Sequence, residues 1–313
     1  MTQSDNESLA ALATEQVRPD LRDLDRMSVD ELVARMAADS SRAPHVVAAA
    51  APAIARAVDA IVERLDHGGR LVYVGAGTAG RLGVLDASEA RPTFNVPAGQ
   101  VVAVLAGGIG AFSDPVEDAE DDTSAGPAAL EVLGVTAADA VVGISASGQT
   151  PYVLAALAWA RDRGALTIGV ACNAGSPLGA RAELAIELPV GPEFIAGSTR
   201  LNAGTAQKIV LNILSTASMV RLGKTYGNLM VDVRASNEKL RDRAARIVSE
   251  ITGASYAESR TALDAAGWET KVAALMLLGG IGAQEARDRL DRTRGRLRGA
   301  VEALTVNRDY AEP

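Results

Sequence analysis

Short, continuous apolar runs alternate with helical segments through the middle of the chain. Each run is followed by a glycine or small polar loop, and the runs lack the apolar–polar alternation of half-exposed strands. Continuous runs are typical of strands that are covered on both faces, as in a parallel sheet. We expect five such strands, at Leu71–Gly75, Val101–Ala106, Ala140–Ile144, Leu166–Ala171 and Leu184–Leu188.

The helical segments between these strands create repeated β–α–β units, which require parallel pairing and right-handed crossovers. The pattern therefore predicts an α/β fold between residues 46 and 235, a three-layer α/β/α sandwich around a five-stranded parallel sheet. The helices that we expect are Val46–Leu65, a segment after Thr78, Asp114–Leu130, Thr150–Asp162 and Ser198–Leu222.

The two ends of the chain lack the strand pattern. Residues 1–45 are polar and weakly amphipathic, and Ser28 and Glu31 have the spacing of a capping box at a helix start. We expect an N-terminal helical extension at 1–45, the α/β domain at 46–235 and a small helical domain at 236–313. The helices expected in the last domain are Lys239–Thr252, Tyr256–Ala266, Lys271–Leu278 and Ala283–Arg292.

Composition and charge exclude several classes of function. The chain of 313 residues has 31 Lys and Arg against 39 Asp and Glu, and a net charge of −8 argues against a nucleic-acid-binding surface. The single cysteine, Cys172, cannot form an intramolecular disulfide or a Cys-rich metal site. His45 and His67 lack metal-ligand spacing, so we expect neither zinc hydrolysis nor a Ser–His–acid triad.

The distribution of apolar residues along the chain also indicates where in the cell the protein is found. No apolar run reaches the roughly 18 residues that span a membrane, and the first ten residues lack the basic and apolar regions of a secretory signal. We therefore expect a cytoplasmic protein with no membrane segment.

The first glycine loop follows the strand at residues 71–75 and fits G-x-G-x-x-G from Gly75 to Gly80. A dinucleotide site would also need an acidic residue at the end of the next strand, which ends Leu105-Ala106-Gly107-Gly108. We therefore favour an anion site over a nicotinamide site. Free N–H groups at the helix start would bind the anion, at Gly77, Thr78 and Ala79.

The second loop lies between another strand and helix and is rich in hydroxyl groups. One helix cap would explain one hydroxyl but not three, and Pro151 near the helix start removes an N–H that would have no partner. The loop suits a phosphate held by neutral donors. The candidate residues are Ser145, Ser147, Gly148, Gln149 and Thr150.

Two acidic segments and one mixed segment complete the candidates. Glu89 ends the segment at residues 85–89, and Glu120 lies in the segment at 116–122. A pair of carboxylates beside a phosphate site can act as acid and base, although spacing alone would not select these two. A third segment, 190–200, contributes Glu193, Ser198 and Arg200 as supporting candidates, with a helix start expected at 197–199.

Four segments closely resemble the N-acetylmuramic acid 6-phosphate etherases, and the similarity runs from about residue 14 to 300. The segments are Val74–Glu89, Ser145–Tyr152, Gly191–Lys208 and Leu222–Arg234. The resemblance implies a sugar isomerase (SIS) domain, which is flavodoxin-like, followed by a helical module that is similar to ubiquitin-associated (UBA) domains.

The resemblance also implies the reaction. The family cleaves the C3 D-lactyl ether of N-acetylmuramic acid 6-phosphate by elimination and water addition, giving N-acetylglucosamine 6-phosphate and D-lactate in cell-wall sugar recycling. Its two catalytic glutamates match Glu89, as the acid for the lactate oxygen, and Glu120, as the base at C2. These two roles could be exchanged. The resemblance implies a homodimer that needs no metal or other cofactor.

The chain departs from the family pattern at a few positions. Ala79 stands where the family usually has Ser, Asn202 where it often has Lys, and Val17-Arg18-Pro19 where it has Arg-Asn-Pro. The alternative functions are a sugar-phosphate isomerase on the same domain, and a non-catalytic sugar-phosphate sensor similar to glucokinase regulatory proteins.

Overall fold

The structure is a computed structural model that describes residues 12–233 and 235–309. The described residues divide into two compact units. The first comprises 12–88 and 98–218, and the second comprises 89–97 and the rest of the chain from 219. Each unit is described separately below.

The first unit begins with three 3-10 turns (Ala13–Glu15, Pro19–Leu21 and Leu24–Arg26) and three helices. Ser28 and Glu31 form the predicted capping box at the start of α2 (Val29–Asp39). The helix predicted at 46–65 is divided into α3 (Arg42–Ala49) and α4 (Ala51–Asp66). Pro52 accounts for the break, because its ring lacks an N–H and clashes with the preceding turn of a continuous helix.

A parallel sheet with strand order β2-β1-β3-β4-β5 forms the centre of this unit. The predicted five-stranded sheet is confirmed, with end points that move by one residue at three strands. Every residue of β1, β3 and β4 is buried, which explains their continuous apolar runs. The strands are β1 (Leu71–Gly75), β2 (Val101–Leu105), β3 (Ala140–Ser145), β4 (Leu166–Ala171) and β5 (Leu184–Glu187).

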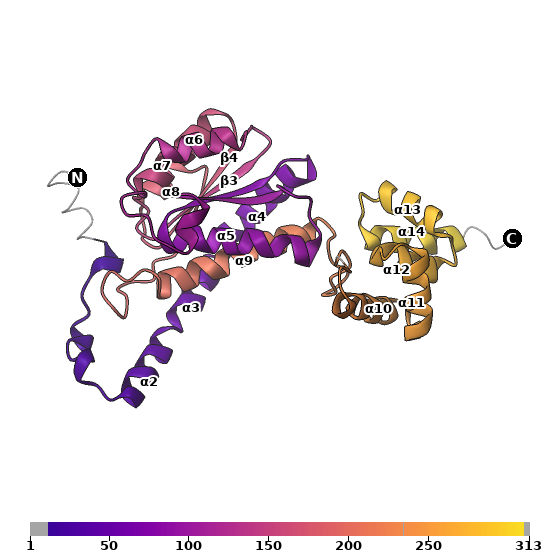
Figure 1. Ribbon diagram of the computed structural model, residues 1–313, viewed down its shortest axis with the longest axis horizontal. Helices are drawn as coiled ribbons and strands as arrows, with labels where there is room; N and C mark the ends of the chain where they lie inside the picture. Colours follow the sequence, from indigo (N-terminus) through magenta and orange to yellow (C-terminus); the bar gives the residue numbers. More distant parts are fainter. Residues whose placement is uncertain (1–11, 234, 310–313) are drawn as a thin grey trace. The chain divides into compact units, whose positions relative to one another are not determined.

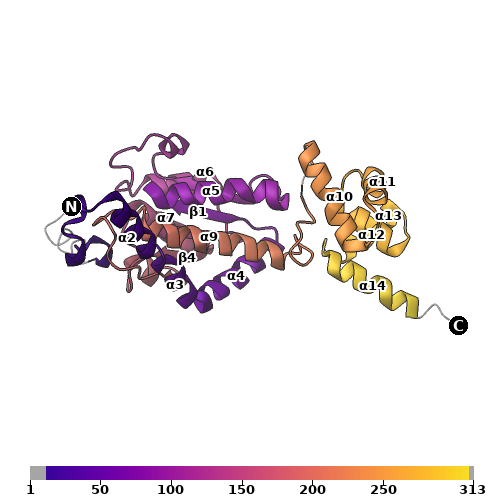
Figure 2. The same cartoon turned by 90° about the horizontal axis from the view of Figure 1, so that it is seen from below.

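Helices cover both faces of the sheet, as the three-layer prediction requires (Figures 1 and 2). One face carries α6 (Ala125–Val132), α7 (Pro151–Asp162) and α8 (Pro177–Arg181), and the other carries α4, α5 (Gly77–Phe94) and α9 (Asn202–Arg221). β1 and β3 are neighbours in the sheet, but the chain continues from them in opposite directions. After β1 it passes to β2 at one edge of the sheet, and after β3 it passes to β4 toward the other edge. This divergence creates a crevice at the carboxyl ends of β1 and β3, the usual ligand site of such sheets.

Two predicted helices begin later than expected. The prediction of a helix over 114–130 is wrong for its first half, because residues 113–124 form turns before α6. Asp122 Oδ1 accepts hydrogen bonds from the N–H groups of Ser124 (2.8 Å) and Ala125 (3.0 Å), which starts the helix there. The helix predicted from Ser198 starts at Asn202.

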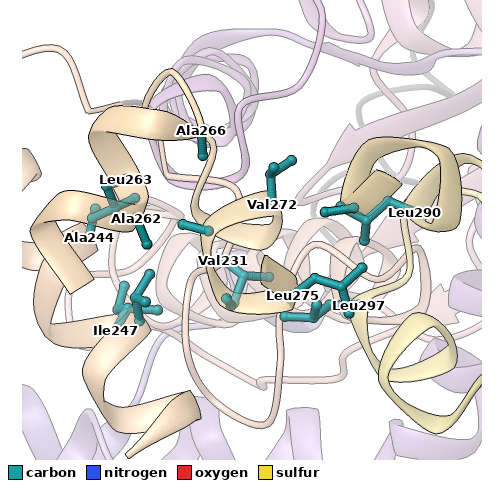
Figure 3. Packing of buried hydrophobic residues seen from close by; sticks show 14 of the residues in the cluster. Val231, Ala244, Ile247, Ala262, Leu263, Ala266, Val272, Leu275, Leu290 and Leu297 are labelled. Carbon is teal, nitrogen blue, oxygen red and sulfur yellow. The ribbon is translucent and has the colours of Figure 1, made fainter. Parts of the chain in front are cut away.

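The second unit contains a bundle of helices. Four of them confirm the sequence prediction, and a fifth, α14, was not predicted because Gly299 and several arginines interrupt its apolar pattern. Buried residues such as Ile247, Leu263 and Leu275 form the core (Figure 3). The helices are α10 (Glu238–Thr252), α11 (Tyr256–Ala265), α12 (Thr270–Gly279), α13 (Ala283–Arg292) and α14 (Leu297–Asp309).

The helices within residues 12–233 and 235–309 differ in length and in apolar content. None of the helices described there is by itself both long and apolar enough to cross a bilayer. One bent pair, Val29–Ala49 with Ala51–Asp66, meets the length and composition requirements.

Candidate functional site

A cavity of about 610 Å³ opens at the crevice between the carboxyl ends of β1 and β3. Its walls come from the loops after these two strands, the turns before α6, the first 3-10 turn and the segment leading into α9. The lining residues are Glu15, Ala76, Gly77, Thr78, Ala79, Glu120, Asp121, Ser145, Ala146, Ser147, Gln149, Thr150, Pro151, Gly197, Thr199 and Gln207.

The glycine loop, residues 75–80, brings a helix start directly to the end of β1. A Cβ atom on Gly80 would lie 2.5 Å from the Gly75 carbonyl oxygen, so the loop can be this tight only with glycine there. Gly77, at φ +52°, begins α5. The first N–H groups of a helix lack intrahelical acceptors. Gly77, Thr78 and Ala79 line the cavity, so their N–H groups are donors of the kind that suit an anion.

The serine loop, residues 145–150, is organised around a buried hydroxyl. Ser145 Oγ accepts a hydrogen bond from Gly148 N (2.9 Å) and lies 2.8 Å from Thr150 Oγ1 and 3.2 Å from Ser147 Oγ. Gly148 has φ +72°, and a Cβ atom there would lie 2.4 Å from Ser176 Cβ. Gly148 therefore packs against Ser176 and does not line the cavity. Ser147 and Thr150, which carry hydroxyl groups, do line it.

Glu120 comes from the turns before α6 and lines the same cavity. Its backbone oxygen accepts a hydrogen bond from Tyr152 N (3.0 Å) in the first turn of α7, which fixes this segment to the helix behind the serine loop. The Tyr152 side chain is buried, and its burial together with the charge of Asp122 raises its pKa to about 12. Tyr152 therefore stays neutral and supports the wall without exchanging a proton near neutral pH.

Four polar lining residues are not among the candidates predicted from the sequence: Glu15, Asp121, Thr199 and Gln207. Gln207 is 1% exposed, and its Nε2 has no hydrogen-bond partner among the described residues. The Ala203–Lys208 motif contains Gln207, but a motif does not reveal which of its side chains face a cavity. Glu15 lies far from the other site residues in sequence, and no local pattern distinguishes it.

Comparisons with known proteins agree with the fold. A SIS domain model matches residues 115–217, and a model of the glucokinase regulatory protein N-terminal SIS domain matches 53–161. An N-acetylmuramic acid 6-phosphate etherase from Rubrobacter xylanophilus is 60% identical to this chain. The alignment covers 91% of this chain and 95% of that etherase. The chain belongs to the N-acetylmuramic acid 6-phosphate etherase family.

Two further relatives carry the same name. The etherase from Streptomyces avermitilis is 53% identical over 94% of this chain and 95% of its own length. The etherase from Serratia proteamaculans is 52% identical over 94% of this chain and 99% of its own length. The likeness therefore extends across both units and is not confined to the SIS domain.

Five predicted residues do not line the cavity: Glu89, Gly148, Glu193, Ser198 and Arg200. Glu193 is 1% exposed, and its carboxylate oxygens accept hydrogen bonds from Asn202 N (2.9 Å) and Ala203 N (2.8 Å). Glu193 thus caps the start of α9 and orients the helix that carries Gln207. Arg200 is exposed and lies before this helix, which starts at Asn202 and not at the expected 197–199.

Glu89 is exposed on α5, twelve residues after Gly77. At 1.5 Å per residue this corresponds to about 18 Å along the helix axis. The helix start lines the cavity, and Glu89 of the same chain lies far along the helix from it.

Two of the three departures from the etherase pattern, Ala79 and Asn202, have different surroundings. Ala79 lines the cavity, where a serine would add a hydroxyl. Asn202 does not line it, because its Nδ2 donates a hydrogen bond to Asp39 Oδ2 (2.7 Å). Burial opposes the charge of Asp39, but hydrogen bonds from Arg42, Arg18 and Asn202 bring its pKa below the usual value.

No group of three or more His, Cys, Asp or Glu side chains is placed to hold a metal ion within residues 12–233 and 235–309. Burial and the charge of Glu193 raise the pKa of Cys172, which keeps this buried thiol protonated. The cavity combines helix-terminal N–H groups and hydroxyls, which suit a phosphate, with carboxylates that can accept or donate protons.

Proposed function

We propose that this chain cleaves the C3 D-lactyl ether of N-acetylmuramic acid 6-phosphate, releasing D-lactate and N-acetylglucosamine 6-phosphate. The observation that carries the proposal is the joining of two phosphate-binding loops and Glu120 in one cavity. A chain 50–60% identical to named etherases over nearly its whole length supports the same activity. We place the reaction in the cytoplasm, in the recycling of cell-wall sugar.

The phosphate of the substrate would be bound by the glycine and serine loops. The protein is acidic overall, so the helix starts of α5 and α7 must supply local positive potential for the dianion. Binding the phosphate, which does not react, positions the sugar carbons near the carboxylates. The backbone N–H groups of Gly77–Ala79 and the hydroxyls of Ser147 and Thr150 are the donors that we assign to this role.

The ether bond would break in the open-chain aldehyde form of the sugar. The C1 aldehyde makes the C2 proton acidic, and the Glu120 carboxylate takes that proton. The electron pair forms a C2–C3 double bond as the C3–O bond breaks, and the lactate oxygen receives a proton from a carboxylic acid. Water then adds to C3, and a proton returns to C2. We assign Glu89 as the acid, with the exchanged assignment as the alternative.

The distance of Glu89 from the start of α5 bears on this assignment. An acid about 18 Å along the helix cannot reach a sugar at the helix start of its own chain. We therefore propose a homodimer in which Glu89 of a second copy completes each site. The exposure of Glu89 is compatible with this role.

Mixing two inactive variants tests this arrangement. A 1:1 mixture of Glu89→Gln and Glu120→Gln chains, allowed to exchange subunits, gives mixed dimers in half of the population. One site of each mixed dimer then has both glutamates, so about a quarter of wild-type activity returns. If both glutamates act within one chain, the mixture stays inactive and the shared-site proposal is wrong.

The activity itself is tested by incubating the protein with N-acetylmuramic acid 6-phosphate and measuring D-lactate. Glu131, exposed on α6 and outside the cavity, gives the matched control Glu131→Gln. Wild type and control should release lactate, and Glu89→Gln and Glu120→Gln should not. An isomerase would exchange the C2 proton with solvent deuterium without releasing lactate, and a sensor would bind the sugar phosphate and do neither.

A further inference from the structure

We propose that Glu15 is a substrate-binding residue whose carboxylate accepts a hydrogen bond from a hydroxyl or amide N–H group of the sugar. The inference deepens the proposed function and rests on it, since it names the contact that recognises the sugar rather than its phosphate. Glu15 ends the first 3-10 turn, Ala13–Glu15, and lines the cavity with Glu120.

Glu15 belongs to a segment that is held firmly against the first unit. Thr14 is completely buried, and its backbone oxygen accepts a hydrogen bond from Gly197 N (3.2 Å). Asn173 Oδ1 accepts a bond from Ala13 N (3.0 Å), and Asn173 Nδ2 donates to Thr14 Oγ1 (3.2 Å). These bonds fix the backbone on the N-terminal side of Glu15, so its carboxylate is not carried by a loose terminus.

The same asparagine connects this segment to the serine loop. Asn173 is 5% exposed, and its Nδ2 also donates to the backbone oxygen of Ala146 (3.0 Å). Ala146 lies between Ser145 and Ser147, inside the loop that we assign to the phosphate. Glu15 therefore has a defined position relative to the proposed phosphate site. A residue that binds the sugar part of the same sugar phosphate needs such a fixed position.

The Glu15 carboxylate lies over Gly197. A Cβ atom on Gly197 would be 2.8 Å from Glu15 Oε2, and Gly197 has φ +74°, so both space and backbone conformation favour glycine there. Among the described residues, the Glu15 side chain makes no hydrogen bond or ion pair with another side chain. Its oxygens remain available to a ligand in the cavity.

The chemistry of a carboxylate defines what it recognises. An ionised carboxylate only accepts hydrogen bonds, and it repels a phosphate dianion. Its partner is therefore a neutral donor, which on an amino-sugar phosphate is a hydroxyl or the amide N–H. Gln207 offers the complementary donor, because its Nε2 has no partner within the described residues. Together they suit sugar hydroxyls, which both donate and accept.

A ligand series tests the inference by calorimetry and does not depend on turnover. The ligands are N-acetylglucosamine 6-phosphate, its 1-deoxy, 3-deoxy and 4-deoxy analogues, and 2-deoxyglucose 6-phosphate, so that each hydroxyl and the amide N–H is absent from one ligand. Glu15→Ala should weaken binding of the intact ligand about 10–100-fold, the usual value for a hydrogen bond to a charged group. For the analogue that lacks the contacted donor, the same substitution should change binding by less than about twofold.

Two variants control for structural effects. Glu15→Gln keeps one carbonyl acceptor and should recover part of the lost affinity, whereas Glu131→Ala should bind every ligand like the wild type. Binding of inorganic phosphate should be unchanged in Glu15→Ala. An equal loss for all five ligands, or no loss for any, would overturn the role of Glu15.

The outcome is separable from that of the proposed function. If wild-type protein releases no lactate, the etherase proposal fails, while the ligand series still shows whether Glu15 contacts the sugar. If lactate is released but the losses do not depend on the missing donor, the Glu15 inference alone is wrong.

Discussion

The glycine and serine loops, which we propose bind the phosphate, and the carboxylates Glu15, Glu120 and Asp121 line one cavity but are built differently. The loops follow β1 and β3 directly, so the most buried strands of the sheet fix their positions. The carboxylates come from a 3-10 turn and from the turns before α6, which depend on contacts with distant segments. In our proposal, the loops at the ends of the regular strands bind the phosphate, and the irregular segments provide the residues for catalysis and sugar recognition.

The largest expected effect is on kcat, and it distinguishes the proposed catalytic carboxylate Glu120 from the loops that we propose bind the phosphate. Glu120→Gln should lower kcat about 10²–10⁴-fold, because general acid–base groups contribute rate factors of this size. Affinity for the product, N-acetylglucosamine 6-phosphate, should change little, because the phosphate loops remain. D-lactate release and calorimetry measure the two quantities. A loss of binding equal to the loss of rate would contradict the division of roles.

The serine loop should show the opposite behaviour. Ser147→Ala and Thr150→Val each remove one hydroxyl from the cavity and should raise KM about 10–100-fold, as expected for lost bonds to a charged group. If the bond is equally strong in the ground state and the transition state, kcat stays near the wild-type value. A fall in kcat with unchanged KM would place these hydroxyls at the reacting carbons instead.

A third prediction concerns the stability of the sheet, at the amino ends of β1 and β3, which lie opposite the ends that form the cavity. Asp139 accepts hydrogen bonds from Arg70 N (2.9 Å), Arg70 Nη2 (2.8 Å) and Thr136 N (2.8 Å). Burial opposes the Asp139 charge, but these bonds bring its pKa below the usual value. The stability that it contributes is present above its unfolded pKa, about 3.9, and is lost as the pH falls through the folded pKa.

Asp139→Asn should therefore lower the free energy of unfolding by about 1–3 kcal/mol at pH 7. The difference from wild type should shrink as the pH falls below about 4. Urea denaturation at several pH values measures this. A pH-independent difference would show that the pair with Arg70 is not the cause, and lactate release at pH 7 should be unchanged in folded protein.

The smallest expected effects come from two of the departures from the family pattern, Ala79 and Asn202. Ala79→Ser adds a hydroxyl to the cavity and should lower KM about 2–5-fold, at the weak end of hydrogen-bond contributions. Asn202→Lys should change KM less than about twofold, because residue 202 contacts Asp39 outside the cavity. Steady-state kinetics of both variants measure the two changes in KM. A larger change for Asn202→Lys than for Ala79→Ser would show that residue 202 affects substrate binding.

Sequence patterns predicted the parts that local physics determines. Continuous apolar runs identified the strands, and glycine-containing loops identified the turns that follow them, where Gly77 and Gly148 have positive φ. The prediction failed where a side chain overrides helix periodicity, as Asp122 does at the start of α6. Glu15 could not be found because its place depends on Asn173, 160 residues away from Ala13. The catalytic roles of Glu89 and Glu120 and the domain boundaries stay predictions.

The hydrogen bonds of Asn173 to Ala13 and Thr14 also have a consequence for biosynthesis. The ribosome makes the N-terminal residues first, so Ala13 and Thr14 emerge long before their partner exists. The cavity stays open on the Glu15 side until β4 and Asn173 have left the exit tunnel and the sheet has formed. Contacts between such distant residues form slowly. A nascent chain halted before residue 173 would therefore contain Glu120 and the serine loop but would not yet close around a sugar.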